Sequence, residues 1–186
     1  PEGHSVGVVK NLAYLTHITI QSNSGPLYDY TAPHILTLED MSPEERHTCV
    51  KVFVNGCWLG NTKDPVSLYC SLKEKKYKGI INIYTSIIFD VKHKEIRVCN
   101  ESGRPTRPVL RVKNNTILVT QQHINSLRAK TLNWDELLTD MTNDTSVIEY
   151  IDPAEQNLSM IAMKPSALSF KHPSNVYNYT HCEIHP

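Results

Sequence analysis

One acidic side chain near the start of the chain stands in a context that suits chemistry. Glu2 lies between Pro1 and Gly3, a turn-forming combination that keeps its backbone out of a helix and lets its carboxylate project. This context predicts a positioning role for Glu2, and the alternative is a turn residue bonded to nearby backbone amides. Gly3 and Gly7 permit close backbone approach, but no P-loop lysine follows them at the spacing that would cradle a phosphate.

Three basic side chains are candidates for contacts with other molecules. Lys10 either contacts a nucleic-acid backbone or stays solvated on the polar side of a short helix. Arg104 and Arg107 lie around a proline in an extended run, where a guanidinium group can bind a phosphate or a carboxylate of a neighbouring subunit. We expect both arginines to bind a carboxylate or a backbone carbonyl rather than a phosphate.

Residues near the end of the sequence include metal-binding types without the pattern of a metal site. His181, Cys182, Glu183 and His185 alternate as on a strand, so Cys182 faces away from both histidines. A structural zinc site needs four converging ligands. No catalytic triad, nucleophile elbow or His-Glu-x-x-His helix stands out either. The sequence therefore predicts no catalytic residue and no metal ligand within this chain.

Composition narrows the class of protein. The 186 residues include 19 basic and 19 acidic side chains, and this balance argues against autonomous binding to nucleic acid. The basic run at 73–78 is expected to be a solvated helix end. Five cysteines without a Cys-x-x-Cys pair indicate a reducing, intracellular compartment, and no apolar run is long enough to span a membrane. Because no methionine opens the chain, we expect an internal segment of a longer protein.

The elements that position these side chains begin with an apolar segment. Its periodicity predicts a short helix over 6–18 that runs into a strand at 16–20. Several prolines and the lack of a sustained period make 27–45 a connecting segment, with one turn of helix near 42–45. The first part of the chain is thus expected to contribute little regular structure.

From residue 49 on, the sequence predicts hairpins and capped helices. The clearest signals are Asn55-Gly56 between two apolar strands and Asp64-Pro65 at the start of a helix that Gly79 closes. The predicted strands are 50–54, 57–60, 83–91, 95–99, 108–112, 117–120, 147–151, 158–163 and 179–186. The predicted helices are 65–76, 123–130 and 134–141, and 164–178 is a predicted loop. The fold class is α+β, a mixed, largely antiparallel sheet of hairpins with short peripheral helices.

Four stretches of the sequence carry a family signature. They are Pro1-Glu2-Gly3 through Lys10-Asn11-Leu12, the hairpin Val52-Phe53-Val54-Asn55-Gly56 with the Pro65 helix, Gly103-Arg104-Pro105-Thr106-Arg107-Pro108-Val109-Leu110, and Glu149-Tyr150-Ile151-Asp152 with Thr180-His181-Cys182-Glu183-Ile184-His185-Pro186. In this order and spacing they resemble the second-largest subunit of multisubunit DNA-directed RNA polymerases, over essentially the whole chain. The Cys-Glu-Ile-His-Pro form is similar to the eukaryotic, archaeal and large-DNA-virus branch. His4-Ser5, Tyr14 and a short acidic insertion after Ile151 lean toward a viral enzyme.

The resemblance implies a division of the chain. Residues 1–48 would form the end of the fork region and a connector, 49–178 the external 2 domain, and 179–186 the start of the hybrid-binding region. The residues implied to lie beside the active centre are Glu2, Gly3, His4 and Ser5. Glu2 would then tune the geometry around the incoming nucleotide without coordinating a metal.

The resemblance also implies a function, a cofactor and partners. The complete enzyme would be a DNA-directed RNA polymerase, whose Mg²⁺ is bound mainly by aspartates of the largest subunit. The isolated segment would be inactive and would bind no cofactor of its own. Its partners would be the largest and other polymerase subunits, with the DNA template and RNA bound only in the assembled enzyme and no membrane. The compartment would be the nucleus, or the cytoplasm or virion for a viral enzyme.

Two other functions stay open from the residues alone. The chain could be a protein-interaction scaffold with no direct role at an active centre, which its balanced charge suits. A freestanding metal-dependent hydrolase would need a converging His/Asp site, and no such spacing is found.

Overall fold

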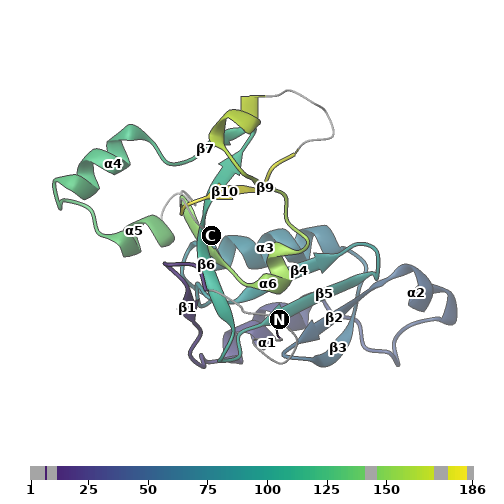
Figure 1. Ribbon diagram of the computed structural model, residues 1–186. Helices are drawn as coiled ribbons and strands as arrows, with labels where there is room; N and C mark the ends of the chain where they lie inside the picture. The colour runs from purple at the N-terminus through teal and green to yellow at the C-terminus, as the bar shows by residue number, and fades with distance from the viewer. Residues whose placement is uncertain (1–6, 8–11, 141–145, 170–175, 184–186) are drawn as a thin grey trace.

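The protein folds around two β-sheets, with one long helix in contact with both (Figure 1). The computed structural model describes residues 7, 12–140, 146–169 and 176–183. One sheet has four strands in the order β3-β2-β5-β4, and the other has six strands around β6. The α+β class predicted from the sequence is confirmed. The sequence predicts one sheet, whereas the described strands form two separate sheets that both contact the long helix.

Two hairpins build the four-stranded sheet. Asn55 and Gly56, with φ angles of 50° and 79°, form the tight turn of the first hairpin, as the sequence predicts. The second hairpin turns through residues 91–94, where Lys94 has a φ of 54°, and its last strand runs parallel to the first strand of the other hairpin. The strands are β2 (Val50–Val54), β3 (Cys57–Thr62), β4 (Ser86–Asp90) and β5 (Glu95–Cys99).

Helix α3 (Pro65–Tyr77) covers the four-stranded sheet. It begins at Asp64, whose carboxylate accepts a backbone N–H of the first turn at 3.2 Å, and it ends before Gly79, where φ is 72°. Leu68 and Leu72 project from the helix into the core of this sheet. The core residues are Leu27, Val50, Val52, Val54, Leu68, Leu72, Ile81, Ile87, Ile96 and Val98.

Strand β6 (Pro105–Lys113) is the axis of the six-stranded sheet (Figure 1). Four short strands pair antiparallel with different parts of it, and β9 pairs parallel with β10. The short strands are β1 (His17–Ile18), β7 (Thr116–Ile117), β8 (Ile148–Ile151), β9 (Ile161–Ala162) and β10 (Tyr179–His181). The strand predicted over 158–163 is therefore mostly wrong, because Leu158 and Met160 are about half exposed and only two residues pair.

The first part of the chain differs from the prediction. Residues 12–16 contain no helix, because Leu12 and Tyr14 are exposed at 66% and 94% and no apolar face is buried. The connecting segment instead contains three short helices, which are α1 (Gly25–Thr31), η1 (Ala32–His34) and α2 (Pro43–Thr48). The predicted turn near 42–45 is confirmed as the start of α2, where Ser42 and Glu45 cap each other's backbone.

Helices α4 (Gln121–Arg128) and α5 (Trp134–Leu138) project from the two sheets at the upper left of Figure 1. Helix α5 lies within the helix predicted over 134–141, and α4 overlaps the helix predicted over 123–130 but begins and ends two residues earlier. Leu137 and Leu138 of α5 pack against Val147 and Ile148, whereas no side chain of α4 is fully buried. The remaining helices are α6 (Pro153–Gln156) and η2 (Pro165–Ser169). No helix in the described ranges combines the length and the apolar character that a membrane crossing requires.

Candidate functional site: a buried charge cluster and an open groove

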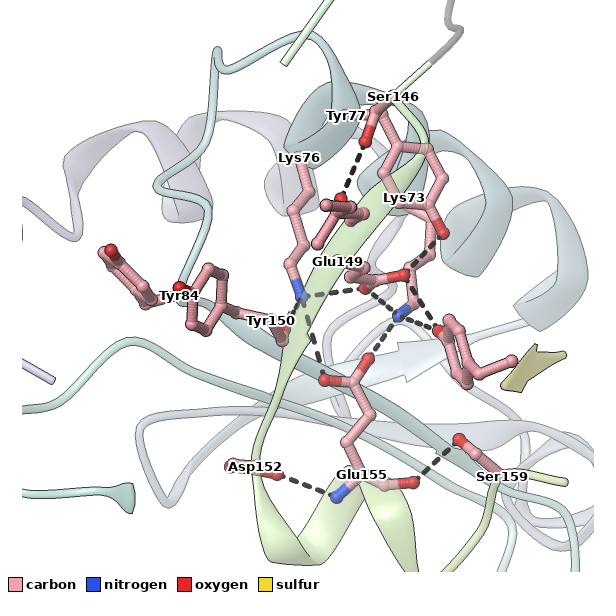
Figure 2. A network of polar contacts seen from close by, with 12 residues as sticks. Lys73, Lys76, Tyr77, Tyr84, Ser146, Glu149, Tyr150, Asp152, Glu155 and Ser159 are labelled. Carbon is pink, nitrogen blue, oxygen red and sulfur yellow. Dashed lines mark hydrogen bonds and ion pairs between the residues drawn. The ribbon is translucent and has the colours of Figure 1, made fainter. Parts of the chain in front are cut away.

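Two lysines and two glutamates form a buried charge cluster between helix α3 and the six-stranded sheet (Figure 2). Lys73 and Lys76 come from α3, Glu149 from β8 and Glu155 from α6, and each is at most 5% exposed. The ammonium groups of Lys73 and Lys76 donate to Oε1 of Glu149 at 2.6 and 2.8 Å. Lys73 also donates to Glu155, and Lys76 lies 3.7 Å from the other oxygen of that carboxylate.

Two tyrosine hydroxyls complete this cluster. Tyr77 donates to Oε2 of Glu149 at 3.0 Å, and Tyr179 of β10 donates to the same oxygen at 2.9 Å. Tyr179 also accepts from Lys73 at 3.2 Å. Burial raises the pKa of both tyrosines, and the adjacent Glu149 carboxylate raises it further. Both hydroxyls are therefore held in the neutral, donating form.

Burial and ion pairing oppose each other within the cluster. Burial would raise the pKa of Glu149, but the Lys73 and Lys76 ammonium groups outweigh it and hold that pKa well below its usual range. Burial raises the pKa of Glu155 by more than the same two ammonium groups lower it. Burial would lower the pKa of Lys73, but the Glu149 and Glu155 carboxylates hold it well above its ordinary value. The four charged residues are buried, and the hydrogen bonds among them tie α3, β8, α6 and β10 together.

The burial of Lys73 and Lys76 corrects the prediction of a solvated helix end at 73–78. Helix α3 has a second covered side, because β8 and α6 lie against the face that carries the two lysines. The available signal was Glu149, a glutamate in the middle of an otherwise apolar strand. A lone acid at a buried strand position calls for a basic partner elsewhere in the fold.

Arg104 is bonded within the chain through all three guanidinium nitrogens. Its Nη1 donates to Oδ2 of Asp152 at 3.0 Å, and its Nε and Nη2 donate to the backbone carbonyls of Glu101 and Tyr84, each at 3.0 Å. Asp152 in turn caps α6, since its Oδ1 accepts the N–H of Glu155 at 2.7 Å (Figure 2). Arg104 thus helps to position the helix that brings Glu155 into the charge cluster.

Arg107 contacts the C-terminal strand. Its Nη1 donates to Nδ1 of His181 at 2.9 Å, and its Nε donates to Oε1 of Gln156 at 3.0 Å. Because arginine can only donate, the His181 proton lies on Nε2, which points to Sδ of Met163 at 3.3 Å. Burial and the Arg107 charge lower the pKa of His181, so this imidazole stays neutral.

The two ends of the described chain meet beside Arg107. The Leu15 N–H donates to Oε2 of Glu183 at 3.1 Å, and β1 pairs with the start of β6. Between these segments lies a groove of about 500 Å³. The described residues that line the groove are Leu12, Ala13, Thr16, Pro105, Thr106, Arg107, Ile151, Pro153, Gln156, Met163 and His181.

Several residues that the sequence singles out lie outside the described ranges. They are Glu2, Gly3, His4, Ser5, Lys10 and His185. Of the predicted contact residues, the structure describes Arg104, which directly precedes β6, and Arg107, which lies within β6, and the two bond to different partners. Within the described part of the chain, no three His, Cys, Asp or Glu side chains gather closely enough to hold a metal ion. The five cysteines are all free thiols.

The sequence matches two families of polymerase domains, in chain order. Residues 52–113 match the family described as RNA polymerase Rpb2, domain 4, and residues 134–186 match the family described as RNA polymerase Rpb2, domain 5. The first match covers the four-stranded sheet with α3 and runs into β6. The second match covers β8, β9 and β10 with the acidic half of the charge cluster.

Single proteins that align with the whole of this chain agree with these domain matches. The chain is 40% identical to the DNA-directed RNA polymerase II subunit RPB2 of Encephalitozoon cuniculi, 34% identical to the DNA-directed RNA polymerase II subunit 2 of Arabidopsis thaliana and 30% identical to the DNA-directed RNA polymerase subunit 2 of Acanthamoeba polyphaga mimivirus. Each alignment covers 100% of this chain, but only 16%, 16% and 17% of the relative. The chain thus spans about a sixth of the length of these relatives.

The two matches are to consecutive domains of one polymerase subunit. The chain belongs to the family of the second-largest subunits of DNA-directed RNA polymerases.

Proposed function

We propose that this chain supports template-directed RNA synthesis by shaping the edge of the polymerase active centre and by forming part of the subunit scaffold. The observation that carries the proposal is the alignment of the whole chain with polymerase subunits, at 40% identity to one of them. The buried charge cluster fits the scaffold role, because it joins four elements of the fold around one carboxylate. RNA synthesis itself belongs to the complete nucleotidyltransferase, and the isolated segment is inactive.

The proposed role leaves the metal chemistry to another subunit. The complete polymerase uses Mg²⁺ to align the attacking hydroxyl and the triphosphate, with the aspartates of the largest subunit as the main ligands. The described residues of this chain do not form a group that fits a metal ion. We propose that the metal-dependent step belongs to the largest subunit and that this segment needs no cofactor of its own.

Within this role, the opening residues Glu2, Gly3, His4 and Ser5 lie beside the active centre, and Glu2 tunes the geometry around the incoming nucleotide. Lys10 contacts nucleic acid or a neighbouring subunit. The division into the fork end and connector at 1–48, the external 2 domain at 49–178 and the hybrid-binding region from 179 stays a prediction. The two sheets and helix α3 would then support these opening residues.

The proposed partners are the largest subunit and the other subunits of the polymerase. DNA template and RNA are bound only in the assembled enzyme, which fits a segment with 19 basic and 19 acidic side chains. The eukaryotic relatives suit a nuclear enzyme, and the mimivirus relative suits one in the cytoplasm or virion.

The alternative function is a protein-interaction scaffold with no direct role at the active centre. The observation that favours it is the open groove beside Arg107, which resembles a docking surface more than a reaction site. Both functions place the chain in the polymerase, so they differ only in what the opening residues do.

The substitution Glu2→Ala in the complete polymerase separates the two functions. We expect a changed elongation rate or nucleotide selection with normal subunit assembly, because the carboxylate tunes the geometry around the incoming nucleotide and is not needed for assembly. Glu39→Ala, at an exposed acid far from the opening stretch in sequence, is the matched control and should leave both unchanged. An elongation rate that is the same in wild type and in Glu2→Ala would favour the scaffold alternative.

A further inference from the structure

Glu183 links the two ends of the described chain. Its Oε2 accepts the N–H of Leu15 at 3.1 Å, across 168 residues of sequence. We propose that Glu183 is a positioning residue for the polymerase reaction: by holding Leu15, it fixes where the opening stretch at 1–12 leaves the folded body. This inference rests on the proposed function, because it takes the opening residues to lie beside the active centre. It adds a residue that acts on them through the backbone of Leu15.

Leu15 is where the start of the chain first bonds to the rest of the fold. Among the described residues from 12 on, it is the first in chain order with a hydrogen bond to another element. Leu12 and Tyr14 are exposed at 66% and 94%, so burial does little to hold the residues before it. The direction of the chain before Leu15 therefore depends on the bond to Glu183.

The chain that follows Leu15 is held by several contacts. Strand β1 pairs with the first two residues of β6, and the Thr106 hydroxyl donates to the His17 carbonyl at 2.9 Å. The His17 ring also stacks on Tyr84, with the ring centroids 4.1 Å apart. The bond to Glu183 extends this anchoring by two residues toward the opening stretch.

Strand β10 holds Glu183 on the other side of this contact. The strand pairs with β6 from Val109 to Arg111, further along the same strand that pairs with β1. Arg107 lies between the two pairings and donates to His181 at 2.9 Å, which fixes the end of β10. Both partners of the Leu15 contact thus start from strands that β6 supports.

The stability of the fold does not account for Glu183. Its Oε1 is buried and has no hydrogen-bond partner within the described part of the chain, and such an oxygen costs free energy. Arg107 supplies a nearby positive charge: burial lowers the pKa of Arg107, and the Glu183 carboxylate opposes that effect. Among the described residues, the hydrogen bond that Glu183 does make is to Leu15. Holding that N–H is therefore the task we assign to this side chain.

Single-nucleotide addition by the assembled polymerase tests the proposal. Glu183→Met and Glu183→Ala, which lack the acceptor oxygen, should lower the rate constant for addition of the correct nucleotide by roughly 10-fold, because a displaced edge misaligns the incoming nucleotide. Glu183→Gln should keep the wild-type value, since its amide oxygen can accept the same N–H. This rate constant does not depend on the fraction of enzyme that is active, so a loss of stability alone does not change it.

Thr180→Val is the matched control for these variants. It removes a buried hydrogen bond of 3.0 Å to the Ala162 carbonyl, three residues before Glu183, and should leave the rate constant unchanged. Wild-type rate constants in Glu183→Met and Glu183→Ala would overturn the proposal. So would a Glu183→Gln enzyme as slow as these two variants, or an equal loss in Thr180→Val.

Hydrogen exchange in the assembled polymerase, followed by mass spectrometry, tests the contact itself. The peptide over 12–20 should exchange faster in Glu183→Met than in wild type, and at the wild-type rate in Glu183→Gln. Unchanged exchange in Glu183→Met would overturn the proposal. The Glu2→Ala variant separates this inference from the proposed function. A normal elongation rate in Glu2→Ala counts against the proposed function, whereas a changed rate in Glu2→Ala with a wild-type rate constant in Glu183→Met contradicts this inference alone.

Discussion

Lys73 is held by acceptors from three different elements. Glu149 in β8, Glu155 in α6 and Tyr179 in β10 each place an oxygen within hydrogen-bonding distance of its ammonium group. A buried ammonium group is tolerated only while its partners stay in place, so the positions of these three elements depend on one another. The sequence could not predict this network, because the partners of Lys73 lie 76 to 106 residues further along the chain.

The first prediction concerns the removal of this ammonium group. Lys73→Met should lower the free energy of unfolding by about 3–5 kcal/mol, because it leaves two buried carboxylates with one lysine. Urea denaturation followed by circular dichroism measures the loss. The matched control is Lys63→Met, which removes an ion pair of 2.7 Å to Glu45 in which the lysine side chain is 60% exposed. Equal losses in the two variants would mean that the cluster adds nothing beyond a surface ion pair.

The second prediction concerns alkaline pH. The folded state raises the pKa of Lys73, Tyr77 and Tyr179, so above about pH 10 it holds more protons than the unfolded chain does. The stability that Lys73 contributes is complete below the pKa of an unfolded lysine and is lost as the pH rises through the folded value. The buried tyrosines act in the same direction, because their unfolded hydroxyls ionise first. In acid, folding lowers the pKa of Glu149 and raises that of Glu155, so their contributions to the pH dependence of stability partly cancel.

We therefore expect the urea midpoint to fall steeply between pH 9.5 and about 11, as the linkage relation requires. Tyr77→Phe should make that fall shallower, because it removes one of the shifted groups. Tyr14→Phe, at a side chain that is 94% exposed, is the control and should not change the slope. The same slope in wild type and Tyr77→Phe would show that the buried hydroxyl is not linked to stability.

Local signals explain which elements the sequence could predict. Asn55-Gly56 and the Asp64 cap determine their turn and helix start within a few residues, and both are confirmed. Helix α1 was not predicted because Gly25 and Pro26 normally interrupt structure, although proline is well tolerated in the first turn of a helix. The division into two sheets depends on long-range packing of α3, which periodicity does not reveal.

The third prediction tests the close contact between the η1 segment and β3. Leu36 pairs with Asn61 through two backbone hydrogen bonds of 2.8 and 3.0 Å, and Gly60 permits this approach. A Cβ atom at Gly60 would lie 2.5 Å from the Leu36 carbonyl oxygen and would also clash with Ile35. Gly60→Ala should therefore cost about 1–3 kcal/mol of unfolding free energy, as overpacking does.

Gly25→Ala is the matched control for this variant. Its Cβ would meet only the Asn23 side chain, at 3.3 Å, and the position lies at the start of α1, where alanine is a better helix former. Thermal unfolding of both variants measures the difference. A loss in Gly25→Ala as large as that in Gly60→Ala would refute the argument from the close backbone approach.

Helix α3 links the core of the four-stranded sheet to the six-stranded sheet within the described part of the chain. Leu68 and Leu72 belong to the core of the four-stranded sheet, and Lys73 and Lys76 of the same helix reach β8 and β10. The residues matched to domain 4 contact those matched to domain 5 at this helix and at β6. Lys73 and Lys76 bond to Glu149, and β6 pairs with β8 and β10. Helix α4 contacts the cluster around Leu137 through the partly buried Leu127, and none of its side chains is fully buried.

The fourth prediction is that the two sheets unfold together. Native-state hydrogen exchange should give the same opening free energy for amides of Val52 in β2 and Val109 in β6. The six-stranded sheet cannot leave α3 without exposing the charge cluster, and the four-stranded sheet cannot leave it without exposing Leu68 and Leu72. Glu149→Gln should lower both values by the same amount. Leu127→Ala, in the partly buried face of α4, is the control and should affect only the α4–α5 region. A Val109 value that falls in Glu149→Gln while the Val52 value stays constant would show that the sheets are independent units and that the cluster stabilises only one of them.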